Sequence, residues 1–198
     1  MKLGIAGVTG KFARRLLTHL LDSSTSNGQE SLTVKRYCRD PAKLPSSLSS
    51  SPRLELLQGS GPRGARLLGD DKLMVEGQKA LIDVCDAATP PVPRYVSSDW
   101  ALGYTKLKLR ELFPKDPMIH VKEYLESKRN VTSVHILVGG FVEPIFSSFF
   151  GIVDADSDVI RHWGDGSEIM EGTTYDDAAR FTARTVLDCQ ASGVLRCR

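Results

Sequence analysis

The chain begins MKLGIAGVTGKFARRLLTHLLD, residues 1–22, and this stretch decides the fold. Its order predicts a short apolar strand over residues 3–6, a glycine turn over residues 7–13 and then a helix. The helix carries a stripe of leucines at Leu16, Leu17, Leu20 and Leu21. A strand that enters a helix through a glycine turn is the arrangement with which a doubly wound α/β fold binds a dinucleotide.

The spacing within this turn is Gly-x-x-Gly-x-x-Ala, so Ala13 stands where a third glycine often lies. Gly7 permits the tight turn, and Gly10 lets the backbone approach a pyrophosphate. The N-terminus of the helix offers N–H groups and a partial positive charge to an anion. The alternative is an ordinary strand-to-helix turn. If a cofactor binds here, the residues expected to contact it are Gly7, Thr9, Gly10, Lys11 and Phe12.

Composition bounds the other possibilities. The 198 residues suffice for one α/β domain, and a net charge of +2 points to neither nucleic acid nor a membrane surface as a partner. No apolar run approaches the ~20 residues of a transmembrane helix. The four cysteines form no C-x-x-C pair and the four histidines are scattered. We therefore expect no metal site and a cytoplasmic protein with free thiols.

Strand and helix patterns alternate along the rest of the chain. Strands are expected over residues 32–38, 53–57, 94–96 and 131–138, and helices over 71–88, 117–128 and 176–187. Alternation of this kind predicts a mostly parallel sheet with helices on its faces. The fold class is therefore α/β, with a Rossmann-like, doubly wound sheet.

One connection is too short for that sheet. In the strand order 3-2-1-4-5-6 the third strand lies at an edge and the fourth near the centre, and a parallel crossover needs a dozen or more residues. Here only the polar, glycine-rich residues 58–64 precede the apolar stretch 65–68. We expect the fourth strand to be missing, so that the 94–96 strand pairs directly with the 3–6 strand. Otherwise residues 65–68 are a remnant of it.

Several stretches together resemble one family. They are GVTGKFARRLL (7–17), CRDPAKL (38–44), GQKALIDVCDAA (77–88), RYVSSDWALGYTKL (94–107), HVKEYLES (120–127), HILVGGFVEP (135–144) and GTTYDDAARFTA (172–183). In this order they resemble the NmrA-like group of atypical short-chain dehydrogenases, which includes isoflavone reductase relatives. The resemblance implies an NADP(H)-binding Rossmann-like domain over residues 1–150 and a partial C-terminal substrate region over residues 151–198.

Two departures from the family concern missing segments. Relatives carry a helix and a central strand before the helix that here reads GQKALID, and they continue beyond the strand that residues 193–198 begin. The chain therefore resembles a member that is truncated internally and at its C-terminus. A gene-model or splicing error and a true fold variant would both read this way.

Arg39 is the candidate for cofactor specificity, because it follows the second strand. An acidic residue there binds a ribose 2′-hydroxyl, whereas an arginine binds a 2′-phosphate, so Arg39 favours NADP(H) over NAD(H). A solvated arginine is the alternative. Asp40 precedes Pro41 and is interpreted as a helix cap rather than as the ribose ligand.

Tyr104 and Lys108 have the Tyr-x-x-x-Lys spacing of catalytic pairs in short-chain dehydrogenases. On a helix the two would share a face, and the ammonium would lower the phenol pKa for proton transfer. Chance occurrence is the alternative. In isoflavone reductase relatives a lysine precedes the helix that here reads HVKEYLES, and Met118 occupies its place. Gly140 follows the expected 131–138 strand at the carboxyl edge of the sheet, where it could line the nicotinamide pocket. A plain glycine between strand and loop is the alternative.

The sequence thus predicts an NADP(H)-binding protein and leaves three functions open. It could be an NADPH-dependent reductase of a small carbonyl or aromatic substrate. It could be a non-catalytic dinucleotide sensor whose partner is a regulatory protein, as NmrA-type regulators are thought to be. It could also be an inactive truncated product. The sequence does not predict an oligomeric state.

Overall fold

The structure is a computed structural model that describes residues 1–26, 32–38, 40–49, 51–58, 71–162 and 164–197. It divides by packing into two compact units, which are described separately. Unit 1 comprises Met1–Gly64 and Tyr175–Cys189, and unit 2 comprises Ala65–Thr174 and Gln190–Arg198. This division follows packing, whereas the boundary expected at residue 150 separates regions by function.

Unit 1 contains a parallel three-stranded sheet in the order β1-β2-β3. Its strands are β1 (Lys2–Ala6), β2 (Thr33–Cys38) and β3 (Leu54–Gln58). Its helices are α1 (Lys11–Ser26), the short η1 (Pro41–Lys43), α2 (Ser46–Ser49) and α6 (Tyr175–Leu187). The strand, turn and helix predicted from the first residues are therefore present.

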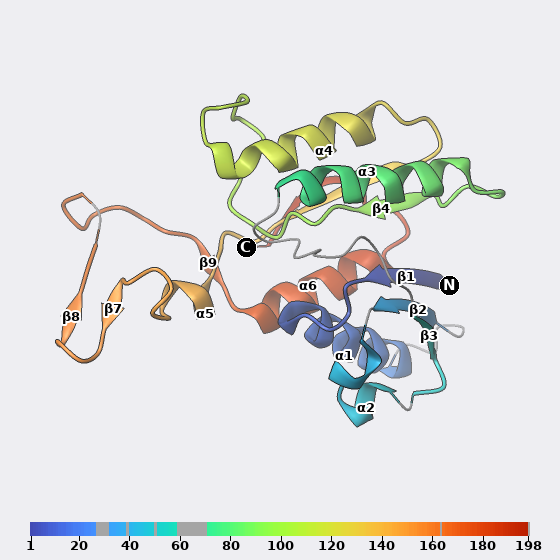
Figure 1. The fold of residues 1–198 in the computed structure, drawn as a ribbon, viewed down its shortest axis with the longest axis horizontal. Helices are drawn as coiled ribbons and strands as arrows, with labels where there is room; N and C mark the ends of the chain where they lie inside the picture. The colour runs from blue at the N-terminus through green and yellow to red at the C-terminus, as the bar shows by residue number, and fades with distance from the viewer. Residues whose placement is uncertain (27–31, 39, 50, 59–70, 163, 198) are drawn as a thin grey trace. The chain divides into compact units, whose positions relative to one another are not determined.

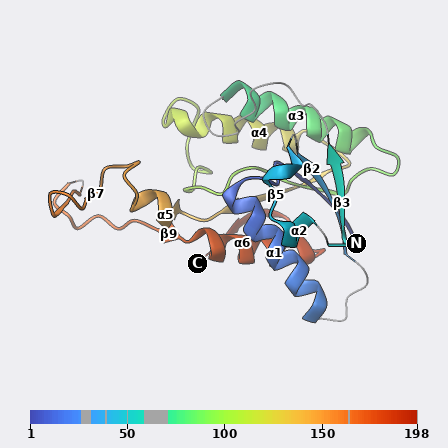
Figure 2. The same ribbon diagram turned by 60° about the horizontal axis from the view of Figure 1, so that its bottom comes forward.

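The core of unit 1 lies between its sheet and two long helices. Helices α1 and α6 run side by side, as both views show (Figures 1 and 2). The leucines of α1 at 16, 17 and 20 are buried, as are the small residues Ala178, Ala179 and Ala183 of α6, which let the helices approach closely. A hydrogen bond of 2.9 Å joins the His19 ring to Asp176 at the start of α6.

Unit 2 contains a second parallel sheet, in the order β10-β5-β4. Its strands are β4 (Arg94–Val96), β5 (Thr132–Leu137) and β10 (Gly193–Arg196). Helices α3 (Asp71–Ala87) and α4 (Asp116–Glu126) pack against each other, and α4 also contacts β5. The apolar side chains buried between them are Ile82, Val121, Leu125 and Val131.

An arm extends from unit 2 between residues 140 and 173 (Figure 1). At its base β6 (Gly140–Phe141) pairs in parallel with β9 (Gly172–Thr173). The arm also contains the short helix α5 (Val142–Ile145) and an antiparallel pair, β7 (Val153–Asp154) and β8 (Val159–Ile160). Large apolar side chains on this arm face solvent, among them Phe149, which is 81% exposed, and Ile169.

The pairing of the central strands is described within each unit. Within unit 1 β1 pairs with β2, and within unit 2 β4 pairs with β5. Direct pairing between β4 and β1 would join the two units, and it stays a prediction. The alternative stand-in, residues 65–68, lies outside the described residues. The α/β class with mostly parallel strands is confirmed. Within the described ranges, no helix is both long enough and apolar enough to span a membrane.

Candidate functional site

The glycine turn between β1 and α1 has the geometry that the sequence predicts. Gly7 has a φ of +78°, a conformation that residues with a side chain rarely adopt. Its N–H still bonds the Tyr37 carbonyl at 3.1 Å, and its own carbonyl accepts the Gly10 N–H at 3.2 Å. The Gly10 carbonyl then accepts the Arg14 N–H at 3.1 Å and begins the helix. The chain therefore turns between Gly7 and Gly10, and α1 begins directly after the turn.

Gly10 is open to the approach of another group. A Cβ built at Gly10 would meet only the Gly7 carbonyl oxygen, at 3.6 Å, which is an ordinary contact. The turn itself thus does not require glycine at this position. A requirement for glycine here would instead come from something outside the chain that approaches the backbone.

A basic depression of about 280 Å³ lies beside this turn, within unit 1. Four of its lining residues come from α1 at the spacing of one helix face, and two come from around α2. Three of the α1 residues are cationic, and in the part of the chain that the structure describes no ion pair neutralises Lys11 or Arg14. The lining residues are Lys11, Arg14, Arg15, Thr18, Pro45 and Leu48. The depression is therefore suited to an anion.

A buried arginine holds one of the residues that line this depression, Leu48. Arg36, on β2, is almost fully buried, and its guanidinium donates to the Leu48 carbonyl at 2.6 Å. That bond ties α2 to the sheet. The guanidinium of Arg15, another lining residue, lies 5.8 Å from the centre of the Tyr175 ring, which helps to orient it.

The two residues after β2 have different outcomes. Asp40 accepts the Ala42 N–H at 3.1 Å through its side chain, so its interpretation as a cap is confirmed. It caps η1, a single short turn. Arg39 lies outside the described residues, and its role in selecting NADP(H) stays a prediction.

Gly140 lies in unit 2, and local packing accounts for the glycine beside it, Gly139. Gly139 has a φ of +72°, and a Cβ there would lie 2.6 Å from the Glu171 carbonyl oxygen. A Cβ at Gly140 would lie 2.6 Å from the end of Ile145. The backbone at Glu171 therefore explains Gly139, whereas the end of the Ile145 side chain could move away from a Cβ at Gly140. A nicotinamide contact at Gly140 stays a prediction.

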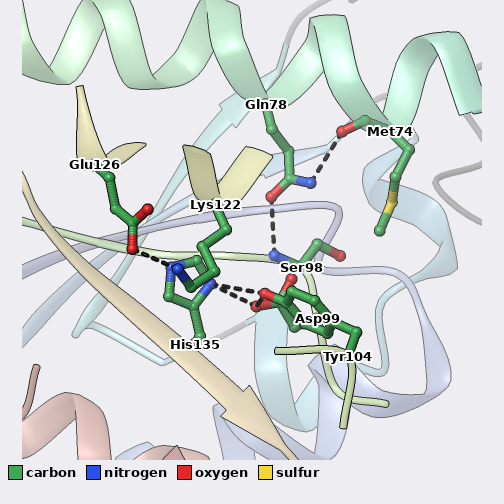
Figure 3. Close-up of polar contacts among 8 residues, drawn as sticks. All are labelled: Met74, Gln78, Ser98, Asp99, Tyr104, Lys122, Glu126 and His135. Carbon is green, nitrogen blue, oxygen red and sulfur yellow. Dashed lines mark hydrogen bonds and ion pairs between the residues drawn. The ribbon is translucent and has the colours of Figure 1, made fainter. Parts of the chain in front are cut away.

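A buried polar cluster lies where β4 ends and joins β5 (Figure 3). The Asp99 carboxylate accepts hydrogen bonds at 2.9 Å from the Tyr104 hydroxyl and at 2.7 Å from His135 Nδ1. Tyr104 is only 1% exposed, and Asp99 and His135 are also buried. Gln78 of α3 accepts the Ser98 N–H at 2.9 Å, which ties the same loop to the helix. The cluster therefore clamps the segment after β4 onto its neighbours.

This environment differs from the catalytic pair that the sequence suggested. Residues 104–108 form turns rather than a helix, so the expectation that Tyr104 and Lys108 share a helix face is wrong. Lys108 is exposed. Burial, together with the Asp99 carboxylate, raises the pKa of Tyr104 well above its usual value. A catalytic role for Tyr104 and Lys108 stays a prediction, without the geometry that first suggested it.

Two residues near this cluster concern the position at which isoflavone reductase relatives have a lysine. Met118, which occupies the lysine position, is buried among Met74, Tyr104 and Leu137. Lys115, three residues earlier, is half-buried, and its burial lowers the pKa of the amine. Met118 therefore has a packing role, and Lys115 is the nearest amine with a perturbed pKa.

Sequence reasoning missed two features of these sites. The sequence places the cations Lys11, Arg14 and Arg15 near a phosphate, but the depression that they line was not predicted. The pairing of Asp99 with His135 joins residues 36 positions apart, and no local pattern signals it. Among the described residues no cluster of His, Cys, Asp and Glu could hold a metal ion.

Comparisons with known proteins show similarity at the level of structure. No family model and no curated protein matches the sequence. AtPrR2 solved with NADP⁺ and (+)pinoresinol matches at 15% identity and a TM-score of 0.67, over 100% of this chain and 69% of that one. The leucoanthocyanidin reductase–NADPH complex from Vitis vinifera matches at 15% identity and a TM-score of 0.67, over 100% of this chain and 68% of that one.

A bacterial structure gives the same result. An NADPH-dependent quinone oxidoreductase from Escherichia coli matches at 16% identity and a TM-score of 0.65, over 98% of this chain and 66% of that one. At such identities the likeness concerns the fold. The chain therefore has a Rossmann-like α/β fold, shared with these NADP(H)-linked proteins, and about a third of their length has no counterpart in it.

Proposed function

We propose that this chain binds NADP(H) at the glycine turn and is an NADPH-dependent reductase of a small carbonyl or aromatic substrate, related to the NmrA-like and isoflavone-reductase-like proteins. The observation that carries the proposal is the open glycine turn beside the basic depression on α1. Two structural neighbours support it, because AtPrR2 was solved with NADP⁺ and the leucoanthocyanidin reductase with NADPH.

The charge distribution supports the choice of nucleotide. The pyrophosphate would lie at the N-terminus of α1, where Gly10 allows close approach and the backbone N–H groups of the first turn favour an anion. NADP(H) carries one more phosphate than NAD(H). Lys11 and Arg14, together with Arg39, would supply cations for that additional charge.

When bound, NADPH would supply the hydride, and the protein would orient the substrate and provide a proton. A phenol is protonated at neutral pH in any case, and the burial that raises the pKa of Tyr104 makes it a weaker proton donor than a free tyrosine. In the proposal, Tyr104 and Lys108 remain the candidates for the proton donor. Lys115 is a second candidate, because burial lowers the pKa of its amine and so makes the ammonium a stronger proton donor.

Two measurements test the proposal in sequence. Calorimetric titration with NADPH tests binding, with Gly10→Val as the variant that blocks the turn. NADPH oxidation is then followed at its absorbance band with quinones and aldehydes as substrates. Binding with turnover supports the reductase. Binding without turnover on any substrate would favour the dinucleotide sensor, and failure to bind would refute both. A cytoplasmic location is part of the same proposal, and the four free cysteines are compatible with it.

A further inference from the structure

Arg15 is a cation of the basic depression to which the proposed function gives no role. Among the residues that the structure describes, the Arg15 side chain makes no hydrogen bond and no ion pair. Its guanidinium instead lies 5.8 Å from the centre of the ring of Tyr175, the first residue of α6. A cation–π contact orients a guanidinium without occupying its N–H donors. Those donors therefore remain available to an anion in the depression.

The ring of Tyr175 is held beside α1 by a neighbouring contact. A hydrogen bond of 2.9 Å joins the carboxylate of Asp176, the next residue of α6, to His19 Nε2. His19 lies four residues after Arg15, so the two side chains share a face of α1. Each of them contacts one of two consecutive residues of α6, and both helices belong to unit 1. The packing of unit 1 alone therefore sets the position of the ring.

Arg15 needs such a contact because its neighbours on α1 repel it. Lys11 lies four residues before Arg15, and like charges at that spacing on a helix repel each other. Arg14 adds a third positive charge, and the first turn of α1 contains no acidic residue that would offset them. Without the ring, this repulsion would turn the Arg15 side chain away from the other two cations. The Tyr175 ring therefore keeps Arg15 at the depression.

We propose that Tyr175 is a positioning residue for NADP(H), because its ring holds Arg15 where the guanidinium can contact the phosphate that distinguishes NADP(H) from NAD(H). This inference rests on the proposed function, since it concerns the same basic depression. Arg15 then contributes to the preference for NADP(H) beside Lys11 and Arg14, and Tyr175 acts only through Arg15. Removing the ring therefore weakens the binding of NADPH and leaves the binding of NADH unchanged.

Four variants separate this positioning role from a structural one. Tyr175→Leu keeps an apolar side chain and removes the ring, whereas Tyr175→Phe keeps the ring. Arg15→Gln removes the charge that the ring orients. Tyr124→Leu is the matched control, because it removes the ring of another cation–π contact, 4.1 Å from the Lys128 ammonium in unit 2. Circular dichroism verifies that each variant is folded.

The experiment is calorimetric titration of each variant with NADPH and, separately, with NADH. We expect Tyr175→Leu to lower the affinity for NADPH by about two- to fivefold, the effect of losing a cation–π contact at an exposed site, with no change for NADH. Tyr175→Phe should retain most of the preference for NADPH, and Tyr124→Leu all of it. Arg15→Gln should lower the affinity for NADPH by about tenfold or more, and adding Tyr175→Leu to it should cause no further loss.

Three results with the variants would overturn the inference. They are an unchanged affinity of Tyr175→Leu for NADPH, an equal loss of affinity for NADPH and NADH, and a further loss when Tyr175→Leu is added to Arg15→Gln. An equal loss for both nucleotides would indicate that Tyr175 only stabilises the packing of α6 on α1. An unmutated chain that binds neither nucleotide would refute the proposed function itself, so the two failures are distinguishable.

Discussion

Replacing Tyr104 with phenylalanine removes one hydroxyl from the buried cluster and leaves the ring in place. That hydroxyl donates to the Asp99 carboxylate at 2.9 Å, and both side chains are almost fully buried. A hydrogen bond to a charged group contributes about 1.5–3 kcal/mol. Asp99 keeps its second donor, His135, so the carboxylate is not left bare. We therefore expect Tyr104→Phe to lower the free energy of unfolding by about 1.5–3 kcal/mol.

Urea unfolding followed by circular dichroism measures this loss. With a slope of about 2–3 kcal/mol per molar urea, the midpoint should fall by about 0.5–1.5 M. Tyr124→Phe is the matched control, since the Tyr124 hydroxyl donates at 2.6 Å to Asp83, a carboxylate on the surface. Its loss should be much smaller, because water and salt screen exposed pairs. If both variants lose the same stability, the reasoning about the buried cluster is refuted.

The same variant makes a prediction about pH. The pKa of Tyr104 is raised in the folded protein, above the usual value of 10.0. Above pH 10 the unfolded chain therefore releases the phenol proton while the folded chain retains it, and stability falls as pH rises. Tyr104→Phe removes this contribution, so its stability should fall less steeply above pH 10. Burial also raises the pKa of Tyr95, so part of the slope remains.

Three further outcomes follow from the turn, the proposed specificity residue and the sheets. Gly10→Val should abolish NADPH binding, because its side chain would block the approach of the pyrophosphate. The circular dichroism should be unchanged, because the added Cβ makes only an ordinary contact within the chain, and normal binding would make the turn purely structural. Arg39→Ala should remove about 1–3 kcal/mol of preference for NADPH over NADH in parallel titrations. The unmutated chain should melt below about 60 °C in calorimetry, because its described sheets have only three strands each, and a cooperative melt above that temperature would contradict this.

Local patterns predicted much of the fold. The predicted helix over residues 117–128 is observed at Asp116–Glu126, and the predicted strand over 131–138 at Thr132–Leu137. Proline at a helix start, helical periodicity and a run of β-branched residues each act within a few residues. The turn at Gly7 was also predictable, because only glycine adopts its φ without strain.

Long-range arrangements could not be predicted in this way. Which strand lies beside β1 depends on pairing between distant segments, and connection length alone does not decide it. The Tyr-x-x-x-Lys spacing indicates a catalytic pair only on a helix, whereas Tyr104 is held in a turn by Asp99. Spacing alone does not report the burial that raises the pKa of that tyrosine.

The most direct test of the account is a calorimetric titration of the unmutated chain with NADPH and, separately, with NADH. The account predicts saturable binding of NADPH at one site, more tightly than NADH, because the depression beside the glycine turn holds cations that the additional phosphate can contact. Equal affinity for the two nucleotides would contradict the assigned specificity. No binding of either would contradict the central claim that this fold binds NADP(H).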